Sequence, residues 1–235
     1  MVAHFKELQF ATAAVATPLC GRKARGCIVG AGTATERRRY KKHSAVCKPP
    51  LLVQAVVIAM KSGEQIITYW LCPGQSVGRE CATLIRDLAA RFDAPIFEPH
   101  VTIHVVGADA ENPEAVLEAV VKSGGSYQLL VRGLEYSDKF TKTLFVQFEP
   151  NAELGQLSHD LERASGRRTD YKLNPHLSLL YKDLDEETKS DLAHSIRLPF
   201  TEVCFDSVKA VICPAKIESR ADVEAWRVVA TRQLT

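Results

Sequence analysis

The chain has 235 residues, of which 46% are hydrophobic, and its formal net charge is +2, which is typical of a globular protein with one large core or two small ones. The longest apolar runs, such as LLVQAVVIAM at 51–60, are shorter than the roughly 20 residues that a membrane-spanning helix needs. The composition therefore argues against a transmembrane protein.

The cysteines give the expected redox environment. There are seven, scattered without a CxxC pair or metal-like spacing, and an odd number argues against the disulfide framework of a small secreted protein. We expect a reducing compartment and no bound metal. The cytoplasm is the expected location, with a plastid or mitochondrion as the alternative if the N-terminal segment is a transit peptide.

The N-terminal segment, residues 1–60, differs in composition from the rest. Residues 1–50 hold ten Lys and Arg against two acidic residues, so this stretch carries +8 and the remainder carries −6. The segment lacks a sustained amphipathic period, and we expect a disordered or dispensable extension before a folded domain at 61–235. Three interpretations stay open: a transit peptide, a basic arm that contacts RNA, or upstream sequence before a true start at Met60.

The body predicts an alternation of strands and helices from about Glu64 onward. The clearest helix follows the turn PGQSVG and places one apolar stripe on a single face before Pro95, made of Cys81, Leu84, Ile85, Leu88 and Phe92. Further helices are expected at 112–124, 151–166 and 185–196, and strands at 64–72, 100–106, 127–136, 142–150, 175–182, 200–208, 209–214 and 224–234.

A short phrase occurs twice in this pattern. Pro99-His100-Val101-Thr102-Ile103 matches Pro175-His176-Leu177-Ser178-Leu179 in kind at every position, and each copy lies in a predicted strand. The repeat suggests two related lobes that face each other. Because side chains alternate along a strand, each copy presents its histidine and its hydroxyl on one face and its apolar residues on the other.

Two imidazoles and two hydroxyls in one cleft suit phosphodiester chemistry. Imidazoles with ordinary pKa values near 6.5 can serve as a base for incoming water and an acid for the departing alkoxide. Thr102 and Ser178 are short donors suited to phosphate oxygens. A histidine in an apolar strand is usually structural when it stands alone, but two matched copies favour a functional pair.

The other histidines lack this pattern. His104 shares the predicted face of His100 but is matched by Leu180 in the second copy, so we interpret it as a residue of the cleft edge or as structural. His159 and His194 lie on predicted helices among charged residues and are expected to be exposed.

The body resembles the two-histidine phosphoesterase superfamily, and within it the cyclic phosphodiesterases of the plant and yeast type. The resemblance rests on the tetrads HVTI and HLSL, on FEPHVT and NPHLSLLY, and on YWLCP and EAWRVVATRQL. It covers residues from about 64 to the end. It implies an α+β fold of two lobes, with two antiparallel sheets, helices outside and a central cleft.

The resemblance also implies residue roles. His100 and His176 would be the catalytic pair, and Thr102 and Ser178 would hold the phosphate. Trp70 stands where the family has an aromatic that contacts the nucleoside, and Tyr181 follows the second motif as a tyrosine that lines the site. Trp226 is interpreted as a packing residue.

The implied substrates are ADP-ribose 1″,2″-cyclic phosphate, which arises in tRNA splicing, and nucleoside 2′,3′-cyclic phosphates. A monomer that takes a small nucleotide and needs no cofactor or membrane is expected.

Two alternatives belong to other functional classes. An RNA-directed relative, similar to 2′-5′ RNA ligase-like or RNA 3′-end processing enzymes, would carry both motifs, but the body is net acidic. A non-catalytic nucleotide-binding module is disfavoured because both motifs are intact. Two groups of cations could bind RNA or the substrate's phosphate: Arg163, Arg167, Arg168 and Lys172 form one, and Lys139 and Lys142 form the other.

Overall fold

The computed structural model describes residues 64–110, 112–121 and 125–234. The extension expected at 1–60 lies outside the described residues. In chain order the elements are β1 (Gln65–Pro73), α1 (Gln75–Phe92), β2 (Val101–Gly107), α2 (Pro113–Val120), β3 (Tyr127–Tyr136), the 3-10 turn η1 (Phe140–Lys142), β4 (Leu144–Phe148), α3 (Ala152–Ala164), β5 (His176–Leu180), α4 (Glu186–Ser195), β6 (Glu202–Pro214), α5 (Arg220–Glu224) and β7 (Arg227–Gln233).

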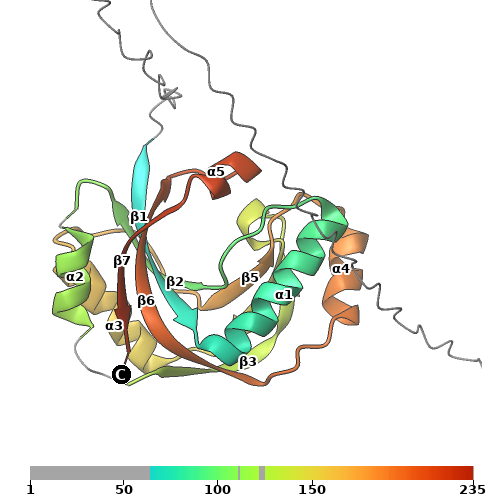
Figure 1. Ribbon diagram of the computed structural model, residues 1–235, viewed down its shortest axis with the longest axis horizontal. Helices are drawn as coiled ribbons and strands as arrows, with labels where there is room; N and C mark the ends of the chain where they lie inside the picture. The colour runs from blue at the N-terminus through green and yellow to red at the C-terminus, as the bar shows by residue number, and fades with distance from the viewer. Residues whose placement is uncertain (1–63, 111, 122–124, 235) are drawn as a thin grey trace, which may run out of the picture. The chain divides into compact units, whose positions relative to one another are not determined.

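The strands form one antiparallel sheet in the order β1-β2-β5-β4-β3-β6-β7, and β1 also pairs with β6. The sheet therefore closes on itself through six strands, with β7 added beside β6 (Figure 1). The predicted α+β class and antiparallel pairing are confirmed. The prediction of two separate sheets is wrong, because β2 and β5 pair at Val101 and Leu177 and so join the two halves.

Strand β6 is the second element that joins the halves. Its first residues, Glu202–Phe205, pair with β3, and residues 207–212 along the same edge pair with β7. Its other edge pairs with β1 over most of its length. The sequence predicted two strands at 200–208 and 209–214, and this was wrong because no turn residue separates Val208 from Lys209.

Four of the five helices in the described part of the chain lie outside the strands in two pairs (Figure 1). Helices α1 and α4 lie near β3, β4 and β5, whereas α2 and α3 lie near β2 and β7. Each pair takes one helix from each copy of the repeat, rather than both helices of one copy. The helix that carries the apolar stripe is confirmed, and it ends at Phe92, where Asp93 adopts a left-handed conformation with φ 48°.

The main core lies between the sheet and the helices. On β1 it contains Tyr69 and Leu71, both fully buried. Trp70 and Cys72 alternate with them and belong to a separate small cluster with Val211 and Trp226. The opposite face of β1 therefore carries its own apolar group inside the ring.

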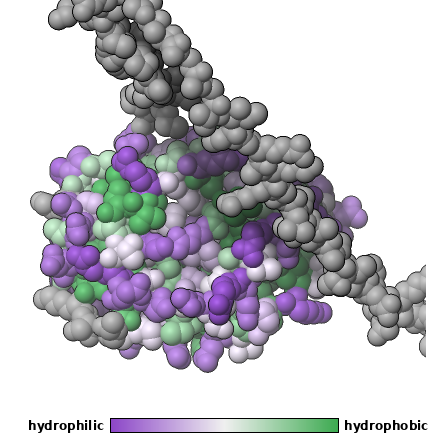
Figure 2. Space-filling view, in the orientation of Figure 1, coloured by the Kyte–Doolittle hydropathy of each residue, from purple (hydrophilic) through white to green (hydrophobic). Residues whose placement is uncertain are grey.

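The visible part of the face shown in Figure 2 is mainly hydrophilic, with separate apolar patches. Among the described residues, the most exposed large apolar side chains are those of Ile96, Leu130 and Val228. No helix among the described residues is long and apolar enough to cross a membrane. Four cysteines are described and all are free: Cys72, Cys81 and Cys213 are buried, and Cys204 is exposed.

Candidate active site

The two histidine motifs lie on neighbouring strands. His100 directly precedes β2, and His176 begins β5. Val101 pairs with Leu177, and both side chains are buried in the main core. Extending this antiparallel register by one residue in each direction sets His100 opposite Ser178 and Thr102 opposite His176. Each imidazole thus faces the hydroxyl residue of the other motif, on the side of the strands opposite to the core.

Both imidazoles are held in the same way. Nδ1 of His100 lies 2.6 Å from the carbonyl oxygen of Glu98, and Nδ1 of His176 lies 2.7 Å from that of Asn174. A carbonyl oxygen only accepts a hydrogen bond, so each Nδ1 carries the proton. Nε2 of each ring is left to exchange a proton with a bound molecule. The proline between the two bonded residues in each motif fixes part of this turn.

The residue two positions before each histidine is itself anchored. The Glu98 carboxylate pairs with the ammonium of Lys209 on β6. The Asn174 side-chain oxygen accepts from Nε2 of Gln147 at 2.9 Å, and Gln147 also donates to the Pro175 carbonyl at 2.8 Å. These contacts fix the carbonyls that orient the imidazoles.

Burial lowers the pKa of both histidines from 6.5 to about 4. For His100, the positive charges of His176 and Lys209 act in the same direction, while the Glu98 carbonyl opposes them. For His176, Lys142 and Lys139 lower the pKa further, and the Asn174 carbonyl opposes them. Both rings are therefore neutral near pH 7 before an anion binds. A phosphate between them would favour protonation.

The predicted hydroxyls have different surroundings. The Ser178 hydroxyl is buried and donates to the Thr141 carbonyl at 2.9 Å. Thr102 is half-buried, and its backbone carbonyl accepts from the Tyr171 hydroxyl at 2.8 Å. Burial raises the pKa of Tyr171 to about 12, so this hydroxyl stays a donor at neutral pH.

Aromatic rings surround His100. The indole of Trp70 stacks on it, with ring centroids 3.8 Å apart and planes 12° from parallel. Trp226 meets the same imidazole edge-on at 5.8 Å. Tyr181 stacks on Phe97 at 4.0 Å and is also buried. The packing residue expected at Trp226 thus belongs to the surroundings of a motif histidine.

An open apolar cavity of about 210 Å³ adjoins these rings. Trp70 and Trp226 line it together with the exposed side chains of Ile96 and Val228. This cavity leaves part of the aromatic cluster accessible beside the His100 imidazole.

His104 does not share the face of His100, contrary to the sequence analysis. The register of β1 and β2 shifts between Tyr69 and Trp70, so that Tyr69 pairs with His104 and Trp70 with Thr102. A bulge of this kind turns the strand, and His104 is buried beside Tyr171, at 6.1 Å between ring centroids. His104 is a structural residue of the helix-covered side. His159 and His194 are exposed, as predicted.

The sequence analysis did not predict that three further residues contribute to the site. Gln147 is the one polar side chain in the otherwise apolar run LFVQF of β4, which is a usable signal for a buried role. Tyr171 lies in an irregular segment that no pattern marks. Trp226 falls within the strand predicted at 224–234, directly before β7, where an aromatic side chain is ordinarily interpreted as packing.

Comparison with known proteins decides the family. The model for cyclic phosphodiesterase-like proteins matches residues 66–234. The chain belongs to this family. It is accordingly a cyclic phosphodiesterase, a class of phosphodiester hydrolase.

Two relatives and one solved structure illustrate the range of similarity. An Arabidopsis thaliana protein named cyclic phosphodiesterase is 23% identical over 175 residues, which span 73% of this chain and 96% of that protein. A Phaeosphaeria nodorum protein named 2′,3′-cyclic-nucleotide 3′-phosphodiesterase is 29% identical over 145 residues, 55% of this chain and 75% of that protein. E. coli LigT, crystallised with 3′-AMP, is 14% identical with a TM-score of 0.48 and covers 73% of this chain and 99% of its own.

Proposed function

We propose that the protein hydrolyses cyclic phosphodiesters by a two-histidine acid and base mechanism without a metal. The substrates are nucleoside 2′,3′-cyclic phosphates, opened to nucleoside 2′-phosphates, and ADP-ribose 1″,2″-cyclic phosphate, opened to ADP-ribose 1″-phosphate. The main support for this proposal is that both imidazoles are held in the same way, by a hydrogen bond from Nδ1 to a backbone carbonyl. This bond leaves Nε2 of each ring for proton transfer.

The surroundings of the two rings support opposite roles. Burial, the main cause of the lowered pKa of His176, keeps this ring neutral near pH 7, as a base that takes a proton from water must be. The indole stacked on His100 stabilises an imidazolium through its π face, which suits the acid. The water oxygen bonds to phosphorus as His176 accepts its proton. The bond from phosphorus to O3′ breaks as His100 protonates the leaving oxygen.

The hydroxyls and aromatic rings are assigned to binding. Thr102 and Ser178 would donate to the phosphate oxygens, for which the Ser178 hydroxyl turns away from the Thr141 carbonyl. The nucleoside side of the substrate would contact Trp70 and Tyr181. Trp70 lines the open apolar cavity, which has room for part of a base.

The relatives support the direction of opening and the kind of substrate. The Phaeosphaeria nodorum relative is named as a 3′-phosphodiesterase of 2′,3′-cyclic nucleotides, which agrees with cleavage at O3′. We expect the protein to act as a monomer on a small nucleotide. Its expected biological role is in RNA metabolism, including tRNA splicing.

The proposal is tested by incubating the full-length protein with each cyclic substrate and with an RNA oligonucleotide, and by reading products with phosphorus NMR. We expect a 2′-phosphate and a 1″-phosphate from the two small substrates. A 3′-phosphate would reverse the assignment of acid and base. Turnover of the RNA alone would replace the proposed substrate class with an RNA-directed one.

A further inference from the structure

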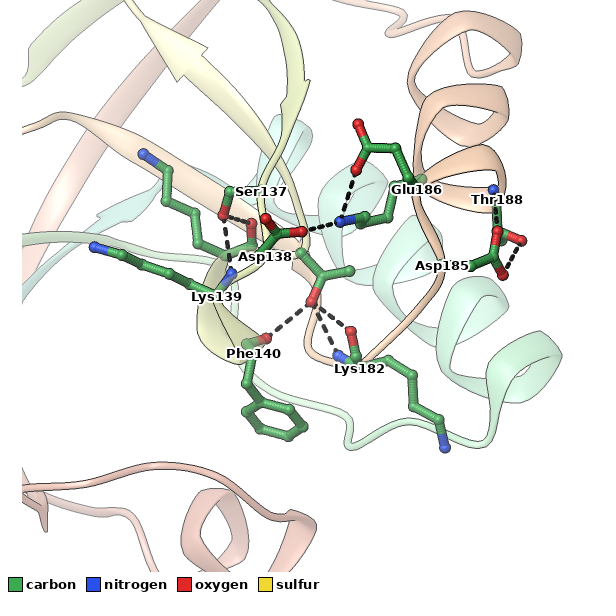
Figure 3. Close-up of polar contacts among 11 residues, drawn as sticks. Ser137, Asp138, Lys139, Phe140, Lys182, Asp185, Glu186 and Thr188 are labelled. Atoms are coloured by element: carbon green, nitrogen blue, oxygen red, sulfur yellow. Dashed lines mark hydrogen bonds and ion pairs between the residues drawn. The ribbon is translucent and has the colours of Figure 1, made fainter.

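The turn between β3 and β4, residues 137–143, lies beside the active site and is braced by hydrogen bonds. We call this turn the platform. Within it, the Ser137 hydroxyl donates to the Lys142 carbonyl at 2.7 Å, and the Lys142 amide donates to the Lys139 carbonyl at 2.8 Å. The Thr143 hydroxyl donates to the Phe140 carbonyl at 3.0 Å. Figure 3 shows Lys139 extending away from this network of short-range bonds.

Helix α4 and the segment after β5 hold the platform in place. Lys189 of α4 is buried and pairs with Asp138 of the turn and with Glu186 (Figure 3). The Thr143 hydroxyl also accepts a hydrogen bond from the Lys182 amide at 3.2 Å. The charge of Asp138 is thus engaged by a buried lysine and does not neutralise its neighbour Lys139.

The platform contacts the second histidine motif directly. The Thr141 carbonyl accepts the Ser178 hydroxyl. The ammonium of Lys142 lies 4.1 Å from the centre of the Phe145 ring, and that ring lies 5.5 Å from the His176 ring. Lys142 and His176 therefore both lie against the Phe145 ring, which places the ammonium group at the His176 side of the site.

The two lysines of the platform are available cations. Among the described residues, neither Lys139 nor Lys142 forms an ion pair within 4.0 Å. The nearby carboxylate of Glu135 is occupied by Arg132, at 2.7 Å. The lysines thus carry two positive charges at the His176 side of the site.

The other cation group is placed differently. Arg163 pairs with Asp160, and Arg167 pairs with Asp109 at 3.0 Å. Lys172 lines a cavity behind β2 together with His104. Of the two groups, only the platform lysines lie beside a motif histidine.

We propose that Lys139 and Lys142 bind a second phosphoryl group of the substrate and make the enzyme selective for cyclic phosphodiesters that carry one. This inference rests on the proposed function. A cyclic phosphodiester has a single negative charge, which two imidazoles and two hydroxyls already serve, whereas a further phosphate or diphosphate needs cations of its own. Flexible ammonium groups on a fixed backbone suit such an anion as point charges.

The test compares adenosine 2′,3′-cyclic phosphate with the same nucleotide bearing a 5′-phosphate. Wild-type protein is expected to give the higher kcat/KM on the 5′-phosphorylated substrate. The double variant Lys139→Gln, Lys142→Gln should lose about tenfold on that substrate and little on the other, as expected for two partly exposed charge pairs. Added salt should reduce the wild-type preference towards that of the variant.

Lys172→Gln is the matched control, since it removes one positive charge that lines the cavity beside His104, and it should leave both substrates unchanged. Thermal unfolding of each variant checks the fold, and Lys142→Arg should retain the preference. An equal loss on both substrates would assign the lysines to the scissile phosphate and overturn the proposal. An unchanged preference in the double variant would overturn it as well. Failure of the proposed function would appear separately, as absence of wild-type turnover on both substrates.

Discussion

The indole of Trp70 lies flat on the imidazole of His100, with ring centroids 3.8 Å apart. Trp70 is only 4% exposed, so much of its surface is used in this contact and in packing against Trp226. The stacked indole is therefore expected to act on the protonation of His100 as well as on substrate binding.

Trp70→Leu should lower kcat on a 2′,3′-cyclic nucleotide by roughly tenfold, because the His100 imidazolium loses the cation–π contact. A lower pKa for the acid means that less of it is protonated at a given pH, so the alkaline limb of the pH profile should move to lower pH. Trp70→Phe should retain part of the effect. A higher KM with an unchanged pH profile would instead restrict the indole to nucleoside binding.

The two motif histidines should make the stability of the protein depend on pH. Their pKa of about 4 in the folded protein lies below the ordinary 6.5, so between these values the unfolded chain binds more protons than the folded one. The free energy of unfolding should rise from pH 4 to 6.5 and then lose this dependence. The stability lost at pH 4.5 relative to neutral pH is on the order of 2 to 3 kcal/mol for each histidine.

Denaturant unfolding at pH 4.5 and 7.5 measures this effect. The double variant His100→Gln, His176→Gln should lose less stability on acidification than wild type, whereas His159→Gln, at an exposed position, should match wild type. Equal acid sensitivity of the double variant and wild type would show that the two imidazoles do not have depressed pKa values.

Gln147 is predicted to position the second motif. Gln147→Leu removes the bonds to Asn174 and Pro175 that fix the turn before His176. We expect kcat to fall by about tenfold while KM changes little, together with a loss of about 1 kcal/mol of stability from the lost hydrogen bonds, since the Pro175 carbonyl still accepts from the Phe148 amide. Steady-state kinetics and thermal unfolding measure both, with Gln156→Leu on the exposed face of α3 as control. A stability loss with unchanged kcat would reduce Gln147 to a purely structural role.

The local patterns of the sequence predicted most elements and the two motif strands. Period-2 alternation placed Val101 and Leu177 in the core, and the apolar stripe predicted α1. Closure of the ring was not predictable, because it depends on the pairing of β1 with β6, whose residues are about 140 positions apart in the chain. The shifted register that buries His104 has the same origin, since it exists only between paired strands.

The site was predictable where it is repeated and not where it is assembled from single residues. The histidines and hydroxyls recur in two copies, which distinguishes them from ordinary strand residues. Trp226 and Tyr171 occur once, in or beside irregular segments, and reach the motifs through tertiary packing. The burial of Lys189 likewise could not be predicted from the sequence of its helix, because its partner Asp138 lies in the turn before η1.

The most direct test of the account is turnover of a 2′,3′-cyclic nucleotide by His100→Ala and His176→Ala, each compared with wild type in the presence and absence of EDTA. The exposed histidines supply matched controls as His159→Ala and His194→Ala. We predict a loss on the order of 10²-fold or more in each motif variant, with a retained fold by circular dichroism, and no effect of EDTA or of the controls. Full activity in either motif variant, or abolition of wild-type activity by EDTA, would contradict a metal-independent two-histidine mechanism.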